Sequence, residues 1–186
     1  YEQYQGALPV RFPVIPGHEP VGRIAEIGDV AAKRWGLQTG DRVCVEAPIP
    51  CGHCRECLTG IYRLCSGHRR FNAYGYIGVD VPPGLWGGYA DYLYLDPHAI
   101  VHKIDPTVSL EIATLFNPLG AGFRWAVEMP RLAPGDTIVI LGPGQRGLAC
   151  VIAAREAGAG RIIVTGLAAD EHKLALARDF GAHHTI

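Results

Sequence analysis

The stretch that decides the fold runs from Thr137 to Gly158 and has the sequence TIVILGPGQRGLACVIAAREAG. Its β-branched and aliphatic start predicts a strand over residues 137–141, and its apolar second half predicts a helix over 148–157 that Gly158 ends. Between the two, residues 142–147 match the pattern G-x-G-x-x-G. This pattern is informative because it lies directly after a predicted strand and directly before a predicted helix.

The glycine pattern predicts a binding site for the pyrophosphate of a dinucleotide. Gly142 permits the tight turn, Gly144 lets the backbone approach the pyrophosphate, and Gly147 lets the helix pack closely on the strand. Gln145 and Arg146 lead into the helix, whose N-terminal N–H groups and positive dipole end favour an anion. The alternative is an ordinary glycine-rich turn between a strand and a helix.

The residues that follow repeat the same alternation. Residues 161–165 predict a second strand, and 170–180 predict a second helix that Gly181 terminates. Residues 181–186 have the character of the entry to a further strand. Strand, helix, strand and helix in this order predict a parallel α/β sheet.

The end of the second predicted strand bears on the choice of nicotinamide cofactor. A carboxylate usually stands there and bonds the ribose 2′-hydroxyl of NAD, but this chain has Gly166 and Leu167, and Asp170 comes four residues late. No arginine follows to bind a 2′-phosphate, although His172 and Lys173 lie within reach. The sequence therefore predicts NAD(P) and leaves the choice between NAD and NADP open.

Residues 21–101 have a different texture. Their apolar residues come in short β-branched or aromatic runs, such as 43–45 and 89–95, which Gly and Pro punctuate. This pattern is typical of an all-β domain. Turns and loops are expected at residues 28–29, 39–41 and 82–84.

Helical spacing first becomes convincing at residues 109–115, where Ser109 is placed to cap a helix. We therefore expect two domains. The first covers residues 1–128 and contains a cysteine-rich lobe at 51–65, and the second covers residues 129–186.

The cysteine-rich lobe predicts a structural zinc site. Cys51, Cys54, Cys57 and Cys65 have the spacing C-x2-C-x2-C-x7-C, and four thiolates brought together so tightly suit a closed tetrahedral zinc site. Disulfides are the main alternative, but the absence of a secretion signal and the presence of an α/β half favour a reducing compartment. An iron–sulfur cluster also uses four cysteines, but this spacing is not that of ferredoxins.

Several other residues with chemical potential are expected to be structural. Cys44 and Cys150 lie in a predicted strand and a predicted helix, where they are expected in the core. His53 lies inside the cysteine lobe, but four sulfurs already complete a tetrahedron. Trp86 and Trp125 are expected to line either a substrate pocket or the core.

Composition limits the classes of partner. The 186 residues include 17 Lys and Arg against 18 Asp and Glu, which gives a net charge of −1 and no broad electrostatic reason to bind nucleic acid or an anionic membrane. No apolar stretch approaches the ~20 residues that cross a bilayer, so we expect a soluble, cytoplasmic protein. Met129 is the only methionine, and the sequence at both ends predicts a piece of a longer parent protein.

Two further motifs complete a family pattern. Residues 17–19 are Gly-His-Glu, an imidazole beside a carboxylate at the entrance to a predicted strand, and residues 87–92 are GGYADY. Together with the cysteines at 51–65 and the glycine pattern at 142–147, in this order, they resemble the zinc-dependent medium-chain dehydrogenase/reductase superfamily. That group contains alcohol, sorbitol and threonine dehydrogenases, and the resemblance spans essentially the whole chain.

The resemblance implies a fold of mixed α/β and β class: a GroES-like β-barrel domain followed by the first part of a Rossmann domain, a doubly wound parallel sheet. It makes His18 a ligand of a catalytic zinc and Glu19 a ligand or close neighbour of that zinc. The family's cysteine ligand would fall before Tyr1. The remaining ligand aligns within residues 116–120, where the chain offers Asn117, a poor zinc ligand that could at most orient a water.

The activity that the resemblance implies is hydride transfer. It predicts an NAD(P)-linked oxidoreductase that interconverts a small alcohol or polyol and a carbonyl, and that forms a homodimer or homotetramer as the full-length protein. One alternative is a zinc-free reductase of double bonds or quinones that uses NADPH, which Asn117 and Gly166 favour and the retained His18 and Glu19 disfavour. Another is an inactive, zinc-stabilised fragment or interaction module.

Overall fold

A computed structural model describes residues 3–8, 10–67 and 72–186. The chain forms two compact units, Tyr1–Thr114 and Leu115–Ile186. None of the helices in the described residues combines the length and the apolar character that a membrane span requires.

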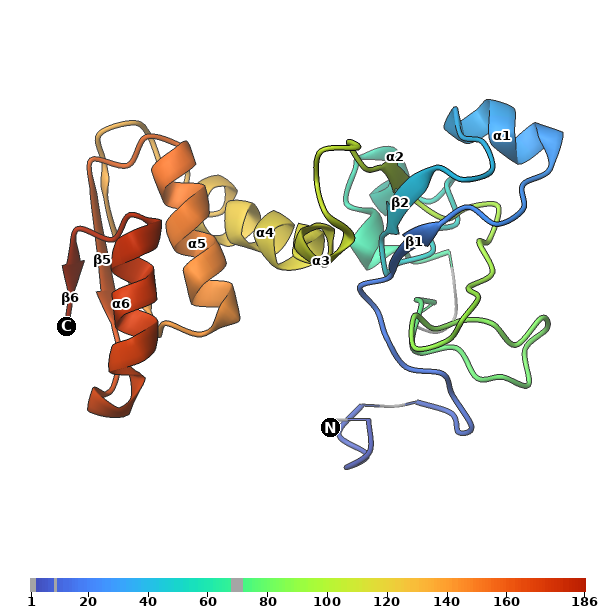
Figure 1. The fold of residues 1–186 in the computed structure, drawn as a ribbon, viewed down its shortest axis with the longest axis horizontal. Helices are drawn as coiled ribbons and strands as arrows, with labels where there is room; N and C mark the ends of the chain where they lie inside the picture. The colour runs from blue at the N-terminus through green and yellow to red at the C-terminus, as the bar shows by residue number, and fades with distance from the viewer. Residues whose placement is uncertain (1–2, 9, 68–71) are drawn as a thin grey trace. The chain divides into compact units, whose positions relative to one another are not determined.

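The first unit is built on a small antiparallel sheet. Strands β1 (Val21–Arg23), β2 (Arg42–Val45) and β3 (Val101–Lys103) pair in the order β1-β2-β3. Figure 1 labels β1 and β2 of this sheet. Cys44 pairs with Val21 on one side and with His102 on the other. Isolated bridges, Val14 to Gly78 and Pro48 to Ala73, tie loops to each other outside this sheet.

The core of the first unit contains two large aromatic side chains. Tyr74 and Trp86 are 0% and 6% exposed. The Tyr74 hydroxyl accepts a hydrogen bond from the Asp96 backbone N–H, and the Trp86 indole N–H donates to the Val81 carbonyl at 2.8 Å. Both polar atoms therefore have hydrogen-bond partners in the interior. Trp86 lies in the core, which is one of the two positions that the sequence allows for it.

The first unit also contains helices, so the expectation of an all-β texture over residues 21–101 is wrong in part. Helix α1 (Asp29–Trp35) begins where a turn was expected at Gly28-Asp29, and Gly36 ends it with a φ of 63°. Residues 89–95 form no named strand. The remaining helices of this unit are short: α2 (Arg55–Leu58), η1 (Tyr62–Leu64) and α3 (Leu110–Ala113). Ser109 caps α3 as expected, because its hydroxyl accepts from the Ile112 N–H.

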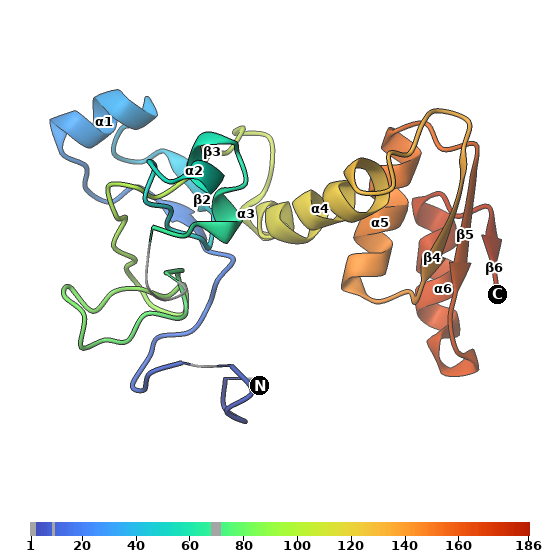
Figure 2. The same ribbon diagram turned by 180° about the vertical axis from the view of Figure 1, so that it is seen from behind.

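The second unit contains the predicted parallel sheet. Strands β4 (Thr137–Leu141), β5 (Arg161–Thr165) and β6 (His184–Thr185) lie side by side in that order, all parallel. Helices α5 (Gln145–Glu156) and α6 (Glu171–Phe180) lie on the same face of the sheet, and Figure 2 shows the strands from the opposite side. A short 3-10 turn, η3 (Ala168–Asp170), precedes α6.

Burial alternates along the strands of this sheet. Ile140, Ile162 and Val164 are buried in one core with residues of α5 and α6. On β4, Val139 and Leu141 are 54% and 82% exposed. The predicted ends of both helices are confirmed, since Gly158 and Gly181 follow α5 and α6 with positive φ values of 83° and 121°.

Helix α4 (Phe116–Phe123) and the π-helical turn η2 (Arg124–Glu128) were not anticipated from the sequence. They belong to the second unit because α4 packs against α5: a Cβ atom at Gly122 would lie 2.6 Å from the backbone of Ala149. The compact unit therefore begins at Leu115, earlier in the chain than the domain boundary that we predict between residues 128 and 129.

Candidate functional site

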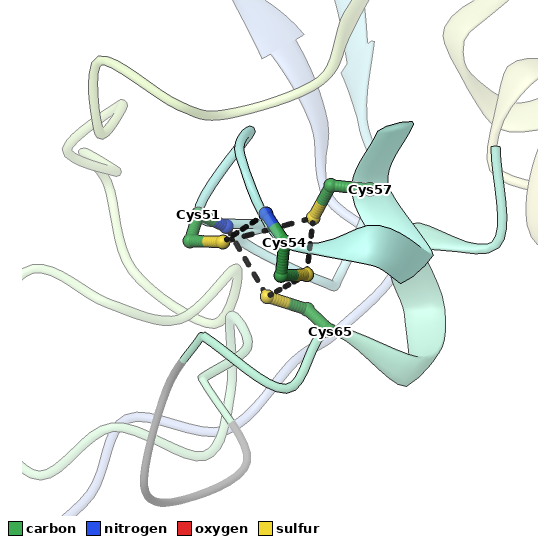
Figure 3. A group of neighbouring side chains, drawn as sticks. All are labelled: Cys51, Cys54, Cys57 and Cys65. Atoms are coloured by element: carbon green, nitrogen blue, oxygen red, sulfur yellow. Dashed lines mark hydrogen bonds between the residues drawn. The ribbon is translucent and has the colours of Figure 1, made fainter. Parts of the chain in front are cut away.

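The four cysteines of the lobe converge on one point (Figure 3). The Sγ atoms of Cys51, Cys54, Cys57 and Cys65 all lie within 4.8 Å of one another. Cys54 Sγ lies 3.4 Å from Cys57 Sγ and 3.8 Å from Cys65 Sγ. Zinc–sulfur bonds of about 2.3 Å place tetrahedral ligand atoms about 3.8 Å apart, so the four sulfurs fit a zinc ion.

Backbone N–H groups prepare the lobe for a cation. The N–H of Cys57 donates to Cys54 and holds the pKa of that thiol at about 6. The N–H of Cys51 donates to Cys65 Sγ at 3.3 Å and lowers the pKa of that thiol as well. The pKa of Cys57 is instead raised to about 12, first by burial and then by its bonds with neighbouring sulfurs. These N–H groups thus favour the thiolate forms of Cys54 and Cys65, the forms that bind a metal ion.

A carboxylate attaches the lobe to the sheet. The hydroxyl of Tyr62, on η1 inside the lobe, donates to Glu46 Oε2 at 2.7 Å, and His102 Nε2 on β3 lies 2.8 Å from Glu46 Oε1. Burial raises the pKa of Glu46, but the hydrogen bonds from His102 and Tyr62 outweigh it, so the pKa lies below its usual range. The bond with Glu46 raises the pKa of His102. This network could not be predicted from the sequence, because Glu46 and His102 are 56 residues apart in the chain.

The glycine turn between β4 and α5 has the geometry that its pattern predicts. Gly142 has a φ of 92°, which favours glycine. A Cβ at Gly147 would overlap the carbonyl oxygen of Gly142, so only glycine permits this approach of helix to strand. A Cβ at Gly144 would meet nothing within 4 Å. The space next to Gly144 is therefore open where a ligand would approach the first turn of α5.

The end of β5 also lies at this turn. A Cβ at Gly166 would lie 3.2 Å from Pro143 of the glycine turn and 3.1 Å from Leu174 of α6. Lys173 Nζ donates a hydrogen bond to Asp170 Oδ1 at 2.7 Å, and this ion pair lowers the pKa of the Asp170 carboxyl. Lys173, one of the two cationic candidates for a 2′-phosphate, is thus already paired with a carboxylate.

His18 and Glu19 are neighbours in space as well as in sequence. His18 Nε2 lies 4.0 Å from Glu19 Oε1, and the two side chains are 46% and 27% exposed. The imidazole ring centroid lies 5.9 Å from that of Tyr76. Two ligands of one tetrahedral zinc lie about 3.3 Å apart, so a small side-chain adjustment would let both atoms bind a single ion.

The backbone before His18 is held by main-chain contacts. Gly17 has a φ of 98°, and a Cβ there would lie 2.9 Å from the Tyr89 nitrogen. The N–H groups of Gly88 and Tyr89 donate to the carbonyls of Gly17 and Pro16, each at 3.0 Å. The GGYADY stretch therefore supports the backbone at His18, although it is not a strand.

Asn117 lies in the first turn of α4 and contacts the glycine turn of the same unit. Its Oδ1 accepts a hydrogen bond from Arg146 Nη1 at 3.0 Å. The Arg146 guanidinium carbon lies 5.8 Å from the centroid of the Trp125 ring, within range of a cation–π interaction. Trp125 and Arg146 line an open cavity of about 340 Å³ beside β4. Trp125 thus lines a cavity, and its expected place in a substrate pocket stays a prediction.

The described residues give an incomplete second metal site. Catalytic zinc takes three protein ligands, and the family resemblance predicts two of them, His18 and Glu19, in this chain. Within residues 3–8, 10–67 and 72–186, the cysteine lobe is the one cluster of three or more His, Cys, Asp or Glu side chains with metal-binding geometry. Cys44 and Cys150, which were expected in the core, are buried. His53 Nδ1 lies 2.9 Å from the Cys51 carbonyl oxygen, so this ring faces the backbone of the lobe.

Comparison with known proteins identifies the family. Residues 1–106 match the model of the alcohol dehydrogenase GroES-like domain. A probable alcohol dehydrogenase of Mycobacterium tuberculosis is 52% identical over 98% of this chain. The chain belongs to the zinc-dependent medium-chain dehydrogenase/reductase superfamily. The expected GroES-like fold and the expected family are thereby confirmed.

Other members of the superfamily differ in the alcohol they are named for. An erythritol/L-threitol dehydrogenase of Mycolicibacterium smegmatis is 38% identical over 93% of this chain. An alcohol dehydrogenase structure from Thermotoga maritima covers 100% of this chain with a TM-score of 0.84 and 31% identity. An acetophenone reductase from Geotrichum candidum in complex with NAD covers 100% of the chain with a TM-score of 0.81 and 29% identity.

These matches concern part of each relative. The chain spans 50% of the mycobacterial alcohol dehydrogenase, 45% of the threitol dehydrogenase, 51% of the Thermotoga structure and 50% of the reductase. A zinc-binding dehydrogenase structure from Sinorhizobium meliloti, bound to NADP, covers 100% of this chain and is itself covered to 49%, with a TM-score of 0.75 and 28% identity.

Replacing Cys54 with serine should remove about one zinc ion per chain, because three thiolates no longer close a tetrahedral site. It should also lower the melting temperature of the protein, since a structural metal stabilises the fold that holds it. Elemental analysis after dialysis without chelator measures the zinc. Cys44→Ala is the control, because this buried cysteine is not a ligand. Unchanged zinc content in Cys54→Ser would contradict the assignment.

The link between Glu46 and His102 should make stability depend on pH. The usual pKa of histidine is 6.5, and because the folded value is raised, the contribution of His102 is complete below that pH and is lost as the pH rises through the folded pKa. The contribution of Glu46 is present above its usual pKa of 4.5 and is lost as the pH falls through its lowered folded pKa.

The destabilisation caused by His102→Gln should therefore be largest between about pH 4.5 and 6.5 and should shrink toward pH 9. We expect about 0.5–1 kcal/mol, because the side chain is half exposed. Urea unfolding across the pH range measures it. His184→Gln, an exposed substitution in the second unit, is the control, and a pH-independent effect of His102→Gln would show that the ion pair does not stabilise the fold.

Proposed function

We propose that the parent protein is an NAD(P)-linked oxidoreductase that interconverts an alcohol or polyol and a carbonyl by hydride transfer. The observation that carries this proposal is the glycine turn, where Gly147 lies against Gly142 and the space next to Gly144 is open. A turn of this shape presents the N-terminal N–H groups of a helix to a pyrophosphate. The relatives named as alcohol, threitol and threonine dehydrogenases support the alcohol as substrate class.

In this proposal each residue of the turn has a part in cofactor binding. Gly142, Gly144 and Gly147 shape the backbone, and the N–H groups of Gln145 and Arg146 at the start of α5 face the pyrophosphate. Gly166 lies against Pro143 at the same turn, at the strand end where the ribose is proposed to bind. The cofactor is NAD or NADP; similar structures hold NAD in one case and NADP in another.

His18 and Glu19 are proposed to act at the substrate oxygen. A zinc ion bound between them would act as a Lewis acid on that oxygen. Gly17 and Tyr89 fix the backbone at this position, so the imidazole is presented by a rigid segment while half its surface remains exposed. The four-cysteine lobe is proposed to hold a separate structural zinc, because its four ligand positions are filled by protein.

A second candidate is a reductase of activated double bonds or quinones that uses NADPH and no catalytic zinc. The contact between Asn117 and Arg146 favours it, because the amide oxygen is engaged by a cation. His18 and Glu19 favour the alcohol dehydrogenase.

We further propose a cytoplasmic protein that forms a homodimer or homotetramer and binds neither nucleic acid nor membranes.

Gly144→Val should weaken dinucleotide binding by roughly tenfold or more, because two methyl groups would occupy the space that the pyrophosphate needs. The fold should survive, since a Cβ at Gly144 meets nothing within 4 Å. Titration of the full-length protein with NADH and with NADPH, followed by fluorescence, measures the affinity and the cofactor preference. Gly120→Ala, an exposed glycine of α4 with open space around it, is the control. Binding of neither nucleotide by the wild type would instead favour an interaction module.

His18→Ala should lower kcat/KM for alcohol oxidation by about a hundredfold or more, because the group at the substrate oxygen is lost. The melting temperature should not change, since the His18 side chain is half exposed. The affinity for NADH should not change either, since the glycine turn that is proposed to bind the dinucleotide does not include His18. Steady-state kinetics of the full-length protein with a panel of alcohols and polyols tests this. His98→Ala, another exposed histidine of the same unit, is the control. Full activity in His18→Ala would disprove the catalytic assignment.

A further inference from the structure

The side chain of Asn117 is committed to a contact inside its own unit. Its Oδ1 accepts from Arg146 Nη1 at 3.0 Å, which joins the first turn of α4 to the first turn of α5. Farther along α4, Gly122 packs against Ala149 of α5. The hydrogen bond therefore lies at one end of a close helix–helix contact, where both partners are held by the backbone.

The donor of this bond is a permanent cation. A guanidinium group stays protonated at every pH at which proteins fold. The ring of Trp125, with its centroid 5.8 Å from the guanidinium carbon, holds the group from a second side. Arg146 is thus fixed by an amide oxygen and by an aromatic face.

A metal ion at Asn117 would compete with this charge. An amide oxygen has two lone pairs, so a hydrogen bond alone does not prevent it from binding a metal. A zinc ion bound to Oδ1 would lie about 2 Å from that oxygen, and hence within about 5 Å of the Arg146 nitrogen. A dication and a guanidinium repel each other strongly at this separation, and a neutral amide is too weak a ligand to compensate.

We propose that Asn117 is not a metal ligand but the residue that positions Arg146, and that the guanidinium keeps divalent cations away from the start of α4. This inference rests on the proposed function, because it concerns the position at which the family resemblance expects the third ligand of a catalytic zinc. Arg146 then has two separate roles. Its backbone N–H faces the pyrophosphate of the proposed cofactor, and its side chain donates a hydrogen bond to Asn117 at the start of α4. A second zinc held by His18 and Glu19 would then take its third ligand from elsewhere in the parent protein.

The test measures zinc per chain in the full-length protein, with the cysteine lobe intact in every variant. Asn117→Leu should leave the zinc content equal to that of the wild type. Asn117→Cys should add none, because Arg146 still occupies the position. Asn117→Cys combined with Arg146→Met should bind added zinc more tightly than Asn117→Cys alone, since it keeps the thiolate and removes the competing cation. Arg124→Met, which removes a positive charge from the same unit without touching Asn117, is the control.

Loss of about one zinc ion in Asn117→Leu would overturn the proposal, because Asn117 would then be a ligand. Equal affinity for added zinc in Asn117→Cys with and without Arg146→Met would overturn the role given to the guanidinium. Asn117→Asp and Asn117→Asp/Arg146→Gln repeat the comparison with a carboxylate, in case the cysteine variants do not fold. Zinc content does not depend on turnover, so these outcomes are separate from those of the alcohol dehydrogenase assay.

Discussion

The carbonyl oxygen of Gly142 lies against the Cα atom of Gly147, and the Leu115–Ile186 unit is arranged around that contact. It brings the first turn of α5 onto the end of β4, so that the N-terminal N–H groups of the helix open beside Gly144. The same approach lets Cys150 and Val151 reach the core shared with β5 and α6. Sheet packing and the proposed binding of the cofactor therefore have one steric requirement, which a single methyl group at Gly147 would violate.

The sequence was most informative where local chemistry decides the structure. Strands β4 and β5 have the bounds predicted from their apolar, β-branched stretches, and positive-φ glycines follow α5 and α6. Helix α1 was not predicted because none of its residues is buried, so its sequence has no apolar periodicity to detect. Helix α4 was not predicted because Pro118, Gly120 and Gly122 are poor helix formers. Pro118 is tolerated in the first turn, and Gly122 is needed for the contact with α5.

The candidate sites divide in the same way. The cysteine spacing and the glycine pattern could be found from the sequence because each is contained in a short segment. The links made by Glu46 and by Arg146 could not, because they join residues distant in the chain and depend on the tertiary fold. Both links attach a functional segment to a helix or strand through a charged hydrogen bond, the kind most sensitive to loss of one partner.

The segment around His18 is fixed by main chain against main chain. A Cβ at Gly75 would lie 2.9 Å from the Gly17 carbonyl oxygen, and a Cβ at Gly87 would overlap the carbonyl of Ile15. Such a junction depends hardly at all on the size or polarity of the surrounding side chains. Substitution of the neighbouring side chains can therefore leave the imidazole of His18 in place. The glycines themselves are the positions where a library should hold the sequence constant.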